Sequence, residues 1–374
     1  MFSSISKVDY SICSWGFETL SKVVFTGGGS AGHVVPALPV MEYLIARSWQ
    51  VVYIGSSSGL EERLVEPLGV AFHSITTGKL RRYWSIDNLF DCFRVPVGVV
   101  QAIRILRKED PDVVFSKGGY VAFPIVVAAW LFRIPVVAHE SDVSPGLANR
   151  LCFWFVNSLC VNFDSTQASV RRLVVTGTPI RKALLEGNAE RGRELLDFRE
   201  KLPIILVVGG SLGAVRLNRL IRATLDQLTV EFNVVHVCGP GNADATRVND
   251  IRYRQLEYVD DGWGDVLACA DVVVSRAGAN SVVELLSLSK PNILVPLPAT
   301  ASRGDQIENA EVARSAGYSA VLQEDELNVE MLTRTIREVF SDRSFWRKRL
   351  SKFRSKDSLA LIISEIERAI ANVD

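Results

Sequence analysis

The chain has 374 residues, of which 48% are hydrophobic and 22% charged, as in a globular protein long enough for two domains. Lysine plus arginine and aspartate plus glutamate both number 42, so the net charge of zero gives no indication of a nucleic-acid partner. No apolar stretch reaches the roughly 18–20 residues of a membrane-spanning helix, since the longest, residues 120–139, is interrupted by Pro124, Arg133 and Pro135.

The cysteines and the first residues of the chain indicate the cellular compartment in which we expect the protein to fold. The six cysteines form no Cys-x-x-Cys pair and no zinc-type cluster, so we expect buried, reduced thiols that suit a reducing cytosol. The first residues carry Lys7, Asp9 and Glu18 without a continuous apolar core. We therefore interpret residues 1–21 as an N-terminal extension rather than a signal peptide.

From residue 22 onward, short apolar runs alternate with helix-length amphipathic segments. Nearly all-apolar runs are typical of parallel strands covered on both faces, and they occur at residues 23–26, 51–55, 113–116, 135–139, 173–177, 204–208, 234–238, 272–275 and 293–296. Helical periodicity marks residues 37–47, 216–228 and 358–371. This alternation predicts doubly wound parallel sheets.

A glycine loop follows the first strand, and a second follows a strand near the middle of the chain. Their sequences are Gly-Gly-Gly-Ser-Ala-Gly at residues 27–32 and Gly-Gly-Ser-Leu-Gly-Ala at residues 209–214. The repetition predicts two similar domains, at residues 22–178 and 179–354, with the boundary near Pro179.

The first loop satisfies the Gly-x-Gly-x-x-Gly pattern of dinucleotide-binding folds. Such folds also place an acid at the end of the second strand, whereas the nearest acids here are Glu61 and Glu62, beyond the turn. A glycine loop that opens a helix is still suited to bind phosphate. Two such loops facing one another could hold two diphosphates; the alternative is two tight turns without a ligand.

The Asp110-Pro-Asp112 sequence matches a D-x-D metal motif of other nucleotide-sugar enzymes. It precedes a predicted strand, which places it at the edge of a parallel sheet away from ligands. We interpret it as a turn and predict no metal.

Short motifs stand in a fixed order from about Lys22 to the C-terminus. They are Gly29-Ser-Ala-Gly-His33, Ser116-Lys-Gly-Gly-Tyr120, His139-Glu140-Ser-Asp142, Gly177-Thr-Pro179-Ile-Arg181, Gly209-Gly-Ser211, Ser275-Arg276-Ala-Gly278 through Glu284, and Asp305-Gln306-Ile-Glu-Asn309. This series resembles the MurG family of UDP-N-acetylglucosamine–N-acetylmuramyl-(pentapeptide) pyrophosphoryl-undecaprenol N-acetylglucosamine transferases.

The resemblance implies an α/β GT-B fold, in which two Rossmann-like doubly wound domains face one another across a cleft. The N-terminal domain would bind the acceptor and the C-terminal domain the donor, with the C-terminal helix of residues 355–374 packing back on the first domain. It implies an inverting transfer of GlcNAc from UDP-GlcNAc to the muramyl 4-hydroxyl of undecaprenyl-linked lipid I. The product would be lipid II for peptidoglycan synthesis, and no cofactor is implied.

The resemblance also implies a UDP-GlcNAc site. Glu284 would accept the ribose hydroxyls, as a carboxylate can from two vicinal hydroxyls; it could also simply complement a helix dipole. Arg181 would contact the donor phosphate, or form a linker ion pair. The other expected donor-site residues are Ser30, Ala31, Gly32, Asp142, Ser211, Val259, Arg276, Gly278, Ala279, Asn280, Ser281, Val282, Val283 and Gln306. Of these, Ser30, Ala31 and Gly32 could instead cradle the lipid I diphosphate.

Two positions in these motifs depart from the pattern of relatives. Many relatives have Gln-Gln where this chain has Asp305-Gln306, and other branches have His-Glu-Gln-Asn where it has His-Glu-Ser-Asp142.

On the acceptor side, His33 is the candidate general base, and Glu140 is the alternative base. A helix N-terminus beside His33 would keep the ring neutral, although the ring could instead only bind anions. Gly29, Tyr120 and Asn149 are the further acceptor-binding candidates.

Because lipid I is anchored in a bilayer, we expect peripheral association with the cytoplasmic face of the cell membrane. Basic and aromatic residues between Lys79 and Phe93, followed by Arg104, Arg107 and Lys108, could contact an anionic membrane surface. They could equally form an ordinary helix with one buried face. Proteins of a cell-wall and division complex are further expected partners.

Two other kinds of function remain as alternatives. One is a different GT-B enzyme that uses a UDP-sugar, such as a lipid glycosyltransferase or an epimerase. The other is a catalytically inactive scaffold in cell-wall synthesis.

Overall fold

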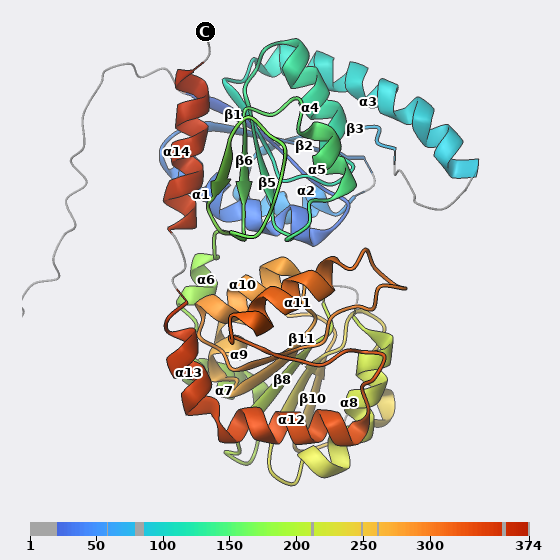
Figure 1. Ribbon diagram of the computed structural model, residues 1–374, viewed down its shortest axis with the longest axis vertical. Helices are drawn as coiled ribbons and strands as arrows, with labels where there is room; N and C mark the ends of the chain where they lie inside the picture. The colour runs from blue at the N-terminus through green and yellow to red at the C-terminus, as the bar shows by residue number, and fades with distance from the viewer. Residues whose placement is uncertain are drawn as a thin grey trace, which may run out of the picture.

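The computed structural model describes residues 21–372 except 58, 79–85, 211–212, 248–249, 260–261 and 354–356, and for residues 86–93 it describes the backbone only. Two α/β domains lie one above the other (Figure 1). The predicted extension, Ser211 and the membrane-facing side chains between Lys79 and Phe93 lie outside this description.

The N-terminal domain is built on a seven-stranded parallel sheet in the order β3-β2-β1-β4-β5-β6-β7. Its strands are β1 (Lys22–Thr26), β2 (Gln50–Ser56), β3 (Ala71–Ile75), β4 (Val113–Ser116), β5 (Val136–Glu140), β6 (Ser158–Val161) and β7 (Leu173–Val175). Its helices are α1 (Leu38–Ala46), α2 (Glu61–Val65), α3 (Ile86–Glu109), α4 (Ala122–Leu131) and α5 (Leu147–Cys152), with short 3-10 turns η1 (Ala31–His33), η2 (Val35–Ala37) and η3 (Glu66–Leu68).

The C-terminal domain repeats this plan with a six-stranded parallel sheet in the order β10-β9-β8-β11-β12-β13. Its strands are β8 (Ile204–Val208), β9 (Asn233–Val237), β10 (Tyr253–Leu256), β11 (Val272–Ser275), β12 (Asn292–Leu294) and β13 (Ala320–Val321). Its helices are α6 (Lys182–Leu185), α7 (Ala189–Leu196), α8 (Val215–Leu228), α9 (Trp263–Cys269), α10 (Ala279–Ser287), α11 (Asp305–Ser315), α12 (Val329–Ser341) and α13 (Arg343–Leu350), with the turn η4 (Ala245–Arg247).

Both sheets confirm the predicted fold class, because the central strands are buried on both faces. In β4 and β11, for example, every residue is buried. A separate apolar cluster covers each face of each sheet. Side chains on both faces of such a strand are removed from water, which explains why the apolar runs are continuous rather than alternating.

The sequence analysis missed four strands, β3, β6, β10 and β13. Three of them, β3, β10 and β13, are edge strands. They are only partly buried, so their sequences contain no continuous apolar run. The fourth, β6, is fully buried but has only four residues and begins with a serine.

In both sheets the strand order reverses at the centre, between β1 and β4 and between β8 and β11. Ligands of doubly wound folds bind outside the carboxyl ends of the strands at such a reversal. The two glycine loops follow β1 and β8, so each begins at the reversal point of its own sheet.

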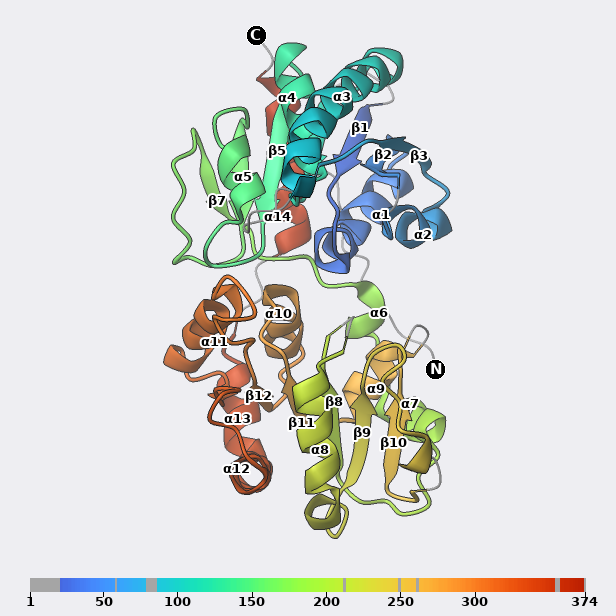
Figure 2. The same cartoon turned by 90° about the vertical axis from the view of Figure 1, so that its right-hand side faces the viewer.

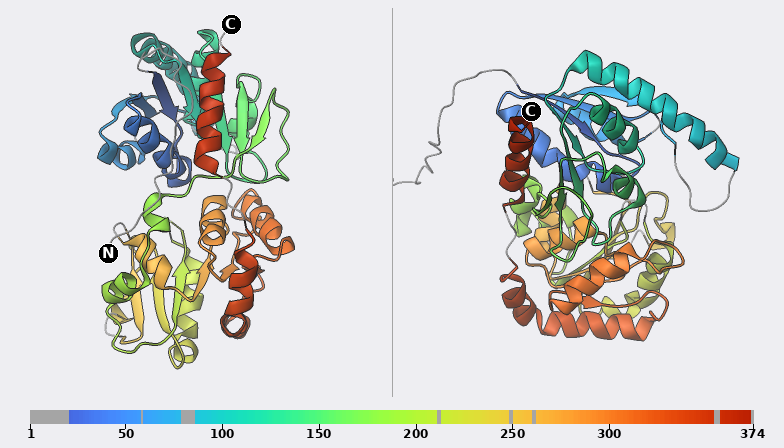
Figure 3. Two further views of the ribbon diagram at one scale, coloured as in Figure 1. Left: turned by 90° about the vertical axis from the view of Figure 1, so that its left-hand side faces the viewer. Right: turned by 45° about the horizontal axis from the view of Figure 1, so that its top comes forward.

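The last helix, α14 (Ser358–Ala371), leaves the second domain and lies along the first (Figures 1 and 3). Ile362, Ile363 and Ile366 enter the core beneath the first sheet. The buried Glu365 carboxylate accepts hydrogen bonds from the Arg172 guanidinium at 2.8 and 3.0 Å and also pairs with Arg368. The chain therefore connects its two domains a second time, although the domain limits given above remain a prediction.

No helix among the described residues is both long enough and apolar enough to cross a bilayer.

If α14 is part of the core of the first domain, Ile366→Ala should lower the free energy of unfolding by about 2–5 kcal/mol, because it leaves a cavity. Ile366 is fully buried, whereas Leu361 on the same helix is 37% exposed. Denaturant unfolding of Ile366→Ala and of the matched Leu361→Ala would measure the difference. Equal small losses would show that α14 does not contribute to the core.

Candidate functional site

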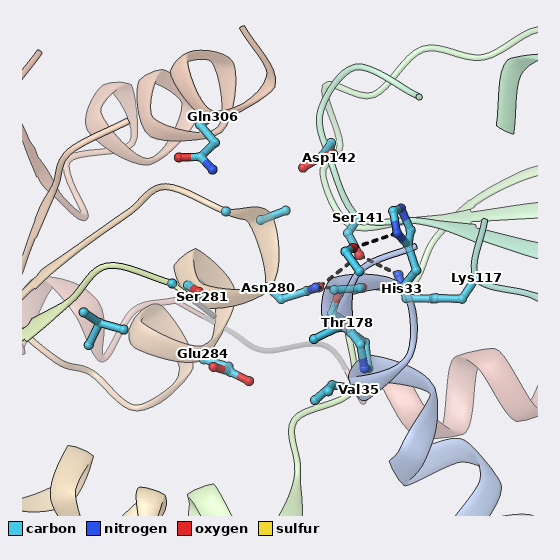
Figure 4. A pocket seen from close by; sticks show the side chains of 18 of the residues that line it. His33, Val35, Lys117, Ser141, Asp142, Thr178, Asn280, Ser281, Glu284 and Gln306 are labelled. Carbon is cyan, nitrogen blue, oxygen red and sulfur yellow. Dashed lines mark hydrogen bonds between the residues drawn. The ribbon is translucent and has the colours of Figure 1, made fainter. Parts of the chain in front are cut away.

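A cavity of about 480 Å³ lies between the two domains, at the carboxyl ends of both sheets. Residues of both domains line it (Figure 4). The lining includes many of the predicted site residues: Ser30, Ala31, Gly32, His33, Glu140, Asp142, Arg181, Val259, Gly278, Ala279, Asn280, Ser281, Glu284 and Gln306. The structure therefore brings most of the predicted residues to one place.

The first glycine loop is hydrogen-bonded to Glu61, a residue to which the sequence analysis gave no role in the site. Glu61 is fully buried, and its carboxylate accepts hydrogen bonds from the Gly29 N–H at 2.8 Å and from the Ser56 hydroxyl at 3.0 Å. Gly29 has φ +87°, and a side chain there would meet Tyr120. Glu61 is thus bonded to the loop itself, because a buried carboxylate needs N–H or O–H partners.

His33 lies at the end of η1, half-buried, with its Nδ1 2.9 Å from the Ser30 hydroxyl. Burial and the nearby positive charge of Lys117 lower the pKa of His33 to about 4, with a smaller contribution from Arg303 and an opposing one from Glu140. The His33 ring is neutral, as predicted, but the cause is burial rather than the helix N-terminus that the sequence analysis named. Burial dominates, and the first helix, α1, begins only at Leu38.

Glu140, the alternative base, ends β5 and is bonded to the loop that follows. Its carboxylate accepts hydrogen bonds from the backbone N–H groups of Asp142 and Gly146, both at 3.0 Å, and from the Asn149 side chain at 2.9 Å. Asn149 is buried behind this carboxylate, and Gly29, Tyr120 and Asn149 do not line the cavity.

The opposite wall comes from the second domain (Figure 4). Gly278 begins α10, and Glu284 lies further along that helix, 3.6 Å from the Arg181 guanidinium. Burial raises the pKa of Glu284, while Arg181 opposes that rise. The Gln306 side chain accepts from the Leu297 N–H at 3.1 Å, which leaves its amide N–H groups available to a ligand.

Three predicted donor residues lie behind this wall rather than on it. Arg276 is buried and donates to Glu324 at 2.6 Å and to the Val295 carbonyl at 3.1 Å, while Val282 and Val283 pack in the core. These contacts direct the guanidinium of Arg276 away from the cavity, so its contact with a ligand stays a prediction that the cavity lining does not favour.

The two departures from the pattern of relatives pair with the same arginine. The guanidinium of Arg303 is 3.1 Å from Asp142 and 3.6 Å from Asp305. The other oxygen of Asp142 accepts from Asn309 of α11 at 3.1 Å. Burial, and secondarily Glu140, raise the pKa of Asp142 to about 6. Both carboxylate oxygens of Asp142 thus contact the second domain.

A second set of contacts across the cleft joins the predicted residues Asn280 and Gly32 to Ser141 and Lys117, which the sequence analysis did not select. The Ser141 hydroxyl donates to the Asn280 side-chain carbonyl at 3.0 Å, and the Asn280 amide donates to the Gly32 carbonyl at 3.1 Å. Lys117 is 2.5 Å from the same Ser141 hydroxyl. Lys117 and Ser141 stood inside recognised motifs, but nothing in the linear sequence indicated that they would face a second domain.

The D-x-D sequence lies at the other end of the first sheet. Asp112 precedes β4, and its carboxylate accepts from the Lys22 N–H at 2.7 Å at the start of β1. This position at the amino ends of the strands confirms that the motif lies away from the cavity.

Comparisons with known proteins agree with this geometry. The glycosyltransferase family 28 N-terminal domain matches residues 23–161, and the glycosyltransferase family 28 C-terminal domain matches residues 204–366.

Two curated relatives are UDP-N-acetylglucosamine–N-acetylmuramyl-(pentapeptide) pyrophosphoryl-undecaprenol N-acetylglucosamine transferases. The one from Legionella pneumophila (strain Paris) is 51% identical over 85% of this chain and 88% of its own length. One from Bacillus cereus (strain ATCC 14579) is 43% identical over 94% of this chain and its whole length. A crystal structure of Acinetobacter baumannii MurG is 27% identical, covers 93% of this chain and 99% of its own, and superposes with a TM-score of 0.74.

We expect the His33 imidazole to titrate near pH 4 instead of its ordinary 6.5, since burial and Lys117 both disfavour the charged ring. Because the folded-state pKa lies below the unfolded one, acidification from pH 6.5 towards 4 should lower the free energy of unfolding. NMR titration of the ring, assigned with His33→Asn, measures this pKa. A midpoint near 6.5 would contradict the buried environment.

Proposed function

The chain belongs to glycosyltransferase family 28, and we propose that it transfers GlcNAc from UDP-GlcNAc to the muramyl 4-hydroxyl of undecaprenyl-linked lipid I, forming lipid II for peptidoglycan synthesis. The observation that carries this conclusion is the high identity, over most of the chain, to relatives that bear this transferase name. The alternatives of another UDP-sugar enzyme or an inactive scaffold are not favoured.

The wall formed by the second domain suits the donor nucleotide. In this proposal Glu284, which lines the cavity, accepts hydrogen bonds from two vicinal ribose hydroxyls, and Arg181 beside it pairs with the diphosphate. When the glycosidic bond to UDP breaks, negative charge grows on the leaving diphosphate. A fixed guanidinium and the N-terminus of α10 stabilise that charge.

The wall formed by the first domain suits the attacking hydroxyl. If the Nδ1–H of His33 donates to Ser30, the Nε2 atom keeps a lone pair that can accept the proton of the sugar hydroxyl. Glu140 lines the same cavity, but three hydrogen bonds already occupy its carboxylate. The geometry therefore supports His33 as the base and gives Glu140 the role of shaping the loop.

Replacing Glu284 with alanine should reduce transfer about 10²-fold or more, because the ribose loses a charge-assisted acceptor and Arg181 loses its partner. The measurement is transfer of labelled GlcNAc from UDP-GlcNAc to a soluble short-chain lipid I analogue. Glu308→Ala, an exposed change on α11 outside the cavity, is the matched control.

The assay also separates the alternatives. Glu284→Ala activity equal to that of Glu308→Ala would contradict the assigned donor site. UDP-GlcNAc binding without transfer by the unchanged chain would favour the scaffold, and release of free sugar would favour an epimerase.

We further propose that the protein binds the cytoplasmic face of the membrane through the first domain. Helices α4 and α5 lie side by side in the first domain (Figure 2), and apolar side chains on both helices and just after α5 are exposed. Trp130, Leu131, Leu151 and Trp154, called here the α4–α5 patch, are 51%, 53%, 40% and 85% exposed. Trp130 contacts Phe155, so the end of α4 lies beside Trp154.

Positive charge accompanies this patch. Arg133 follows α4, Arg150 lies within α5, and Arg107 of α3 is placed over the ring of Phe132. All three arginines are exposed. Exposed aromatic residues beside basic ones favour the interface of an anionic bilayer. Contacts with other proteins of cell-wall synthesis and division remain a prediction.

The double change Trp130→Ser and Trp154→Ser should weaken binding to vesicles containing anionic lipid by about tenfold or more, since it removes the two largest exposed apolar side chains of the patch. Vesicle co-sedimentation measures this. The control is Leu185→Ser with Leu195→Ser, which changes two apolar residues of the other domain that are 59% and 58% exposed. Equal binding by both double variants would rule out the α4–α5 patch.

A further inference from the structure

Lys117 is a buried cation at the centre of the cleft. It follows directly after β4, at the reversal point of the first sheet, and its backbone N–H donates to the Thr26 carbonyl at 2.7 Å. The residue is 3% exposed, yet it lines the cavity together with His33 (Figure 4). The sequence analysis gave this residue no role.

The two side chains that contact the ammonium are neutral. Its Nζ lies 2.8 Å from His139 Nδ1 and 2.5 Å from the Ser141 hydroxyl. His139 Nε2 is 2.9 Å from the Gly177 carbonyl, which can only accept, so Nε2 carries the proton. Burial lowers the pKa of His139 well below its ordinary value, so the ring is neutral and its Nδ1 accepts from Lys117.

The carboxylates of Glu140 and Asp142, which flank Ser141 in the sequence, form their hydrogen bonds and ion pairs with groups other than Lys117. Glu140 accepts from the loop of residues 142–149, and Asp142 pairs with Arg303 and Asn309 across the cleft. In the described part of the chain, no carboxylate oxygen lies within 4 Å of Lys117 Nζ. Burial lowers the pKa of Lys117 to about 8, while the nearby charges of Glu140 and Asp142 oppose that change, so the ammonium is mostly charged at neutral pH.

A buried ammonium that has no carboxylate in direct contact is only partly compensated by charges further away, so an anionic ligand at its free donor would stabilise it. An ammonium has three N–H donors, and His139 and Ser141 use two of them. The third donor, which carries part of a positive charge that no carboxylate contacts directly, is therefore available to an anion in the cavity. Phosphate oxygens, the chief anionic groups of both substrates, are the natural match.

We propose that Lys117 binds the diphosphate of the lipid-linked acceptor and positions the acceptor beside His33. This inference rests on the function proposed above. The acceptor is the favoured source of the diphosphate because Lys117 belongs to the first domain, on the wall of the glycine loop and His33. The donor diphosphate has Arg181 on the facing wall, beside Glu284.

The ammonium is also connected to the donor side through hydrogen bonds. Lys117 donates to Ser141, Ser141 to Asn280 at the start of α10, and Asn280 to the Gly32 carbonyl. An acceptor held at Lys117 thereby contacts a chain of groups that spans the cleft. Lys117 is thus a binding residue for the acceptor, and it reaches the donor wall only through Ser141 and Asn280.

The test is steady-state kinetics of Lys117→Met, which removes the charge but keeps much of the apolar stem. The KM for a soluble diphosphate-linked acceptor should rise roughly 10- to 100-fold, the loss of one charge-assisted hydrogen bond. The KM for UDP-GlcNAc should change less than about threefold. An unchanged acceptor KM, or a rise confined to UDP-GlcNAc, would overturn the proposal.

A second acceptor, in which a neutral linker replaces the diphosphate, isolates the charge. The wild-type chain should bind it roughly 10- to 100-fold more weakly than the diphosphate acceptor, and Lys117→Met should bind both about equally. Equal KM values of the wild-type chain for both acceptors would overturn the proposal without any variant. A wild-type chain that transfers nothing to either acceptor would instead refute the proposed function.

Two matched variants separate charge from structure. Lys290→Met removes another partly buried lysine, which donates to the Ala268 and Ala270 carbonyls outside the cavity, and it should leave the acceptor KM unchanged. Lys117→Arg keeps a positive charge at the same position, and it should raise the acceptor KM less than about threefold. If either variant reproduced the Lys117→Met effect, the role of Lys117 would be structural.

Discussion

The direction of the strands is the constraint on which the rest of this structure depends. All strands of each sheet run parallel, so every loop that follows a strand emerges at the same edge. The two sheets present these edges to one another, and both reverse their strand order at the centre. The loops after β1, β4 and β5 therefore meet the loops after β8 and β11 around one cavity. Residues more than 100 positions apart become neighbours only because of this opposed arrangement.

The polar groups of the site divide into those that hold the loops and those that face the cavity. Glu61, Glu140 and Arg276 are buried, and each is bonded to backbone or side-chain groups of the protein itself. Burial requires this, since an unpaired polar group in the interior is costly. Lys117 has only neutral hydrogen-bond partners, and the Gln306 side chain accepts through its oxygen, so both residues keep N–H donors for a ligand at the cavity wall.

The contacts across the cleft give a physical account of the positions where the chain differs from its relatives. A carboxylate at position 142 forms an ion pair with the Arg303 guanidinium. The side-chain amide of asparagine is neutral and could not form that ion pair. Asp305 lies on the other side of the same guanidinium. Asp142 and Asp305 thus share one arginine partner, which belongs to the loop before α11. Together with Asn280 and Gly32, these contacts hold the two domains around the cavity.

The sequence by itself determined the fold class, the central strands, the last helix and most of the residues around the cavity. Continuous apolar runs mark buried parallel strands wherever both faces are covered, and glycine loops mark the reversal points. Partly exposed end strands such as β3 and β10 lack that signal, so they appeared only in the tertiary structure. Tertiary structure alone also decided that Glu61 supports the first glycine loop, that Arg276 turns inward to Glu324, and that Lys117 lies buried without a carboxylate partner among the described residues. The reason is that hydrogen bonds and charge pairs depend on distances of a few ångströms between elements far apart in the chain, and no local pattern of residues encodes those distances.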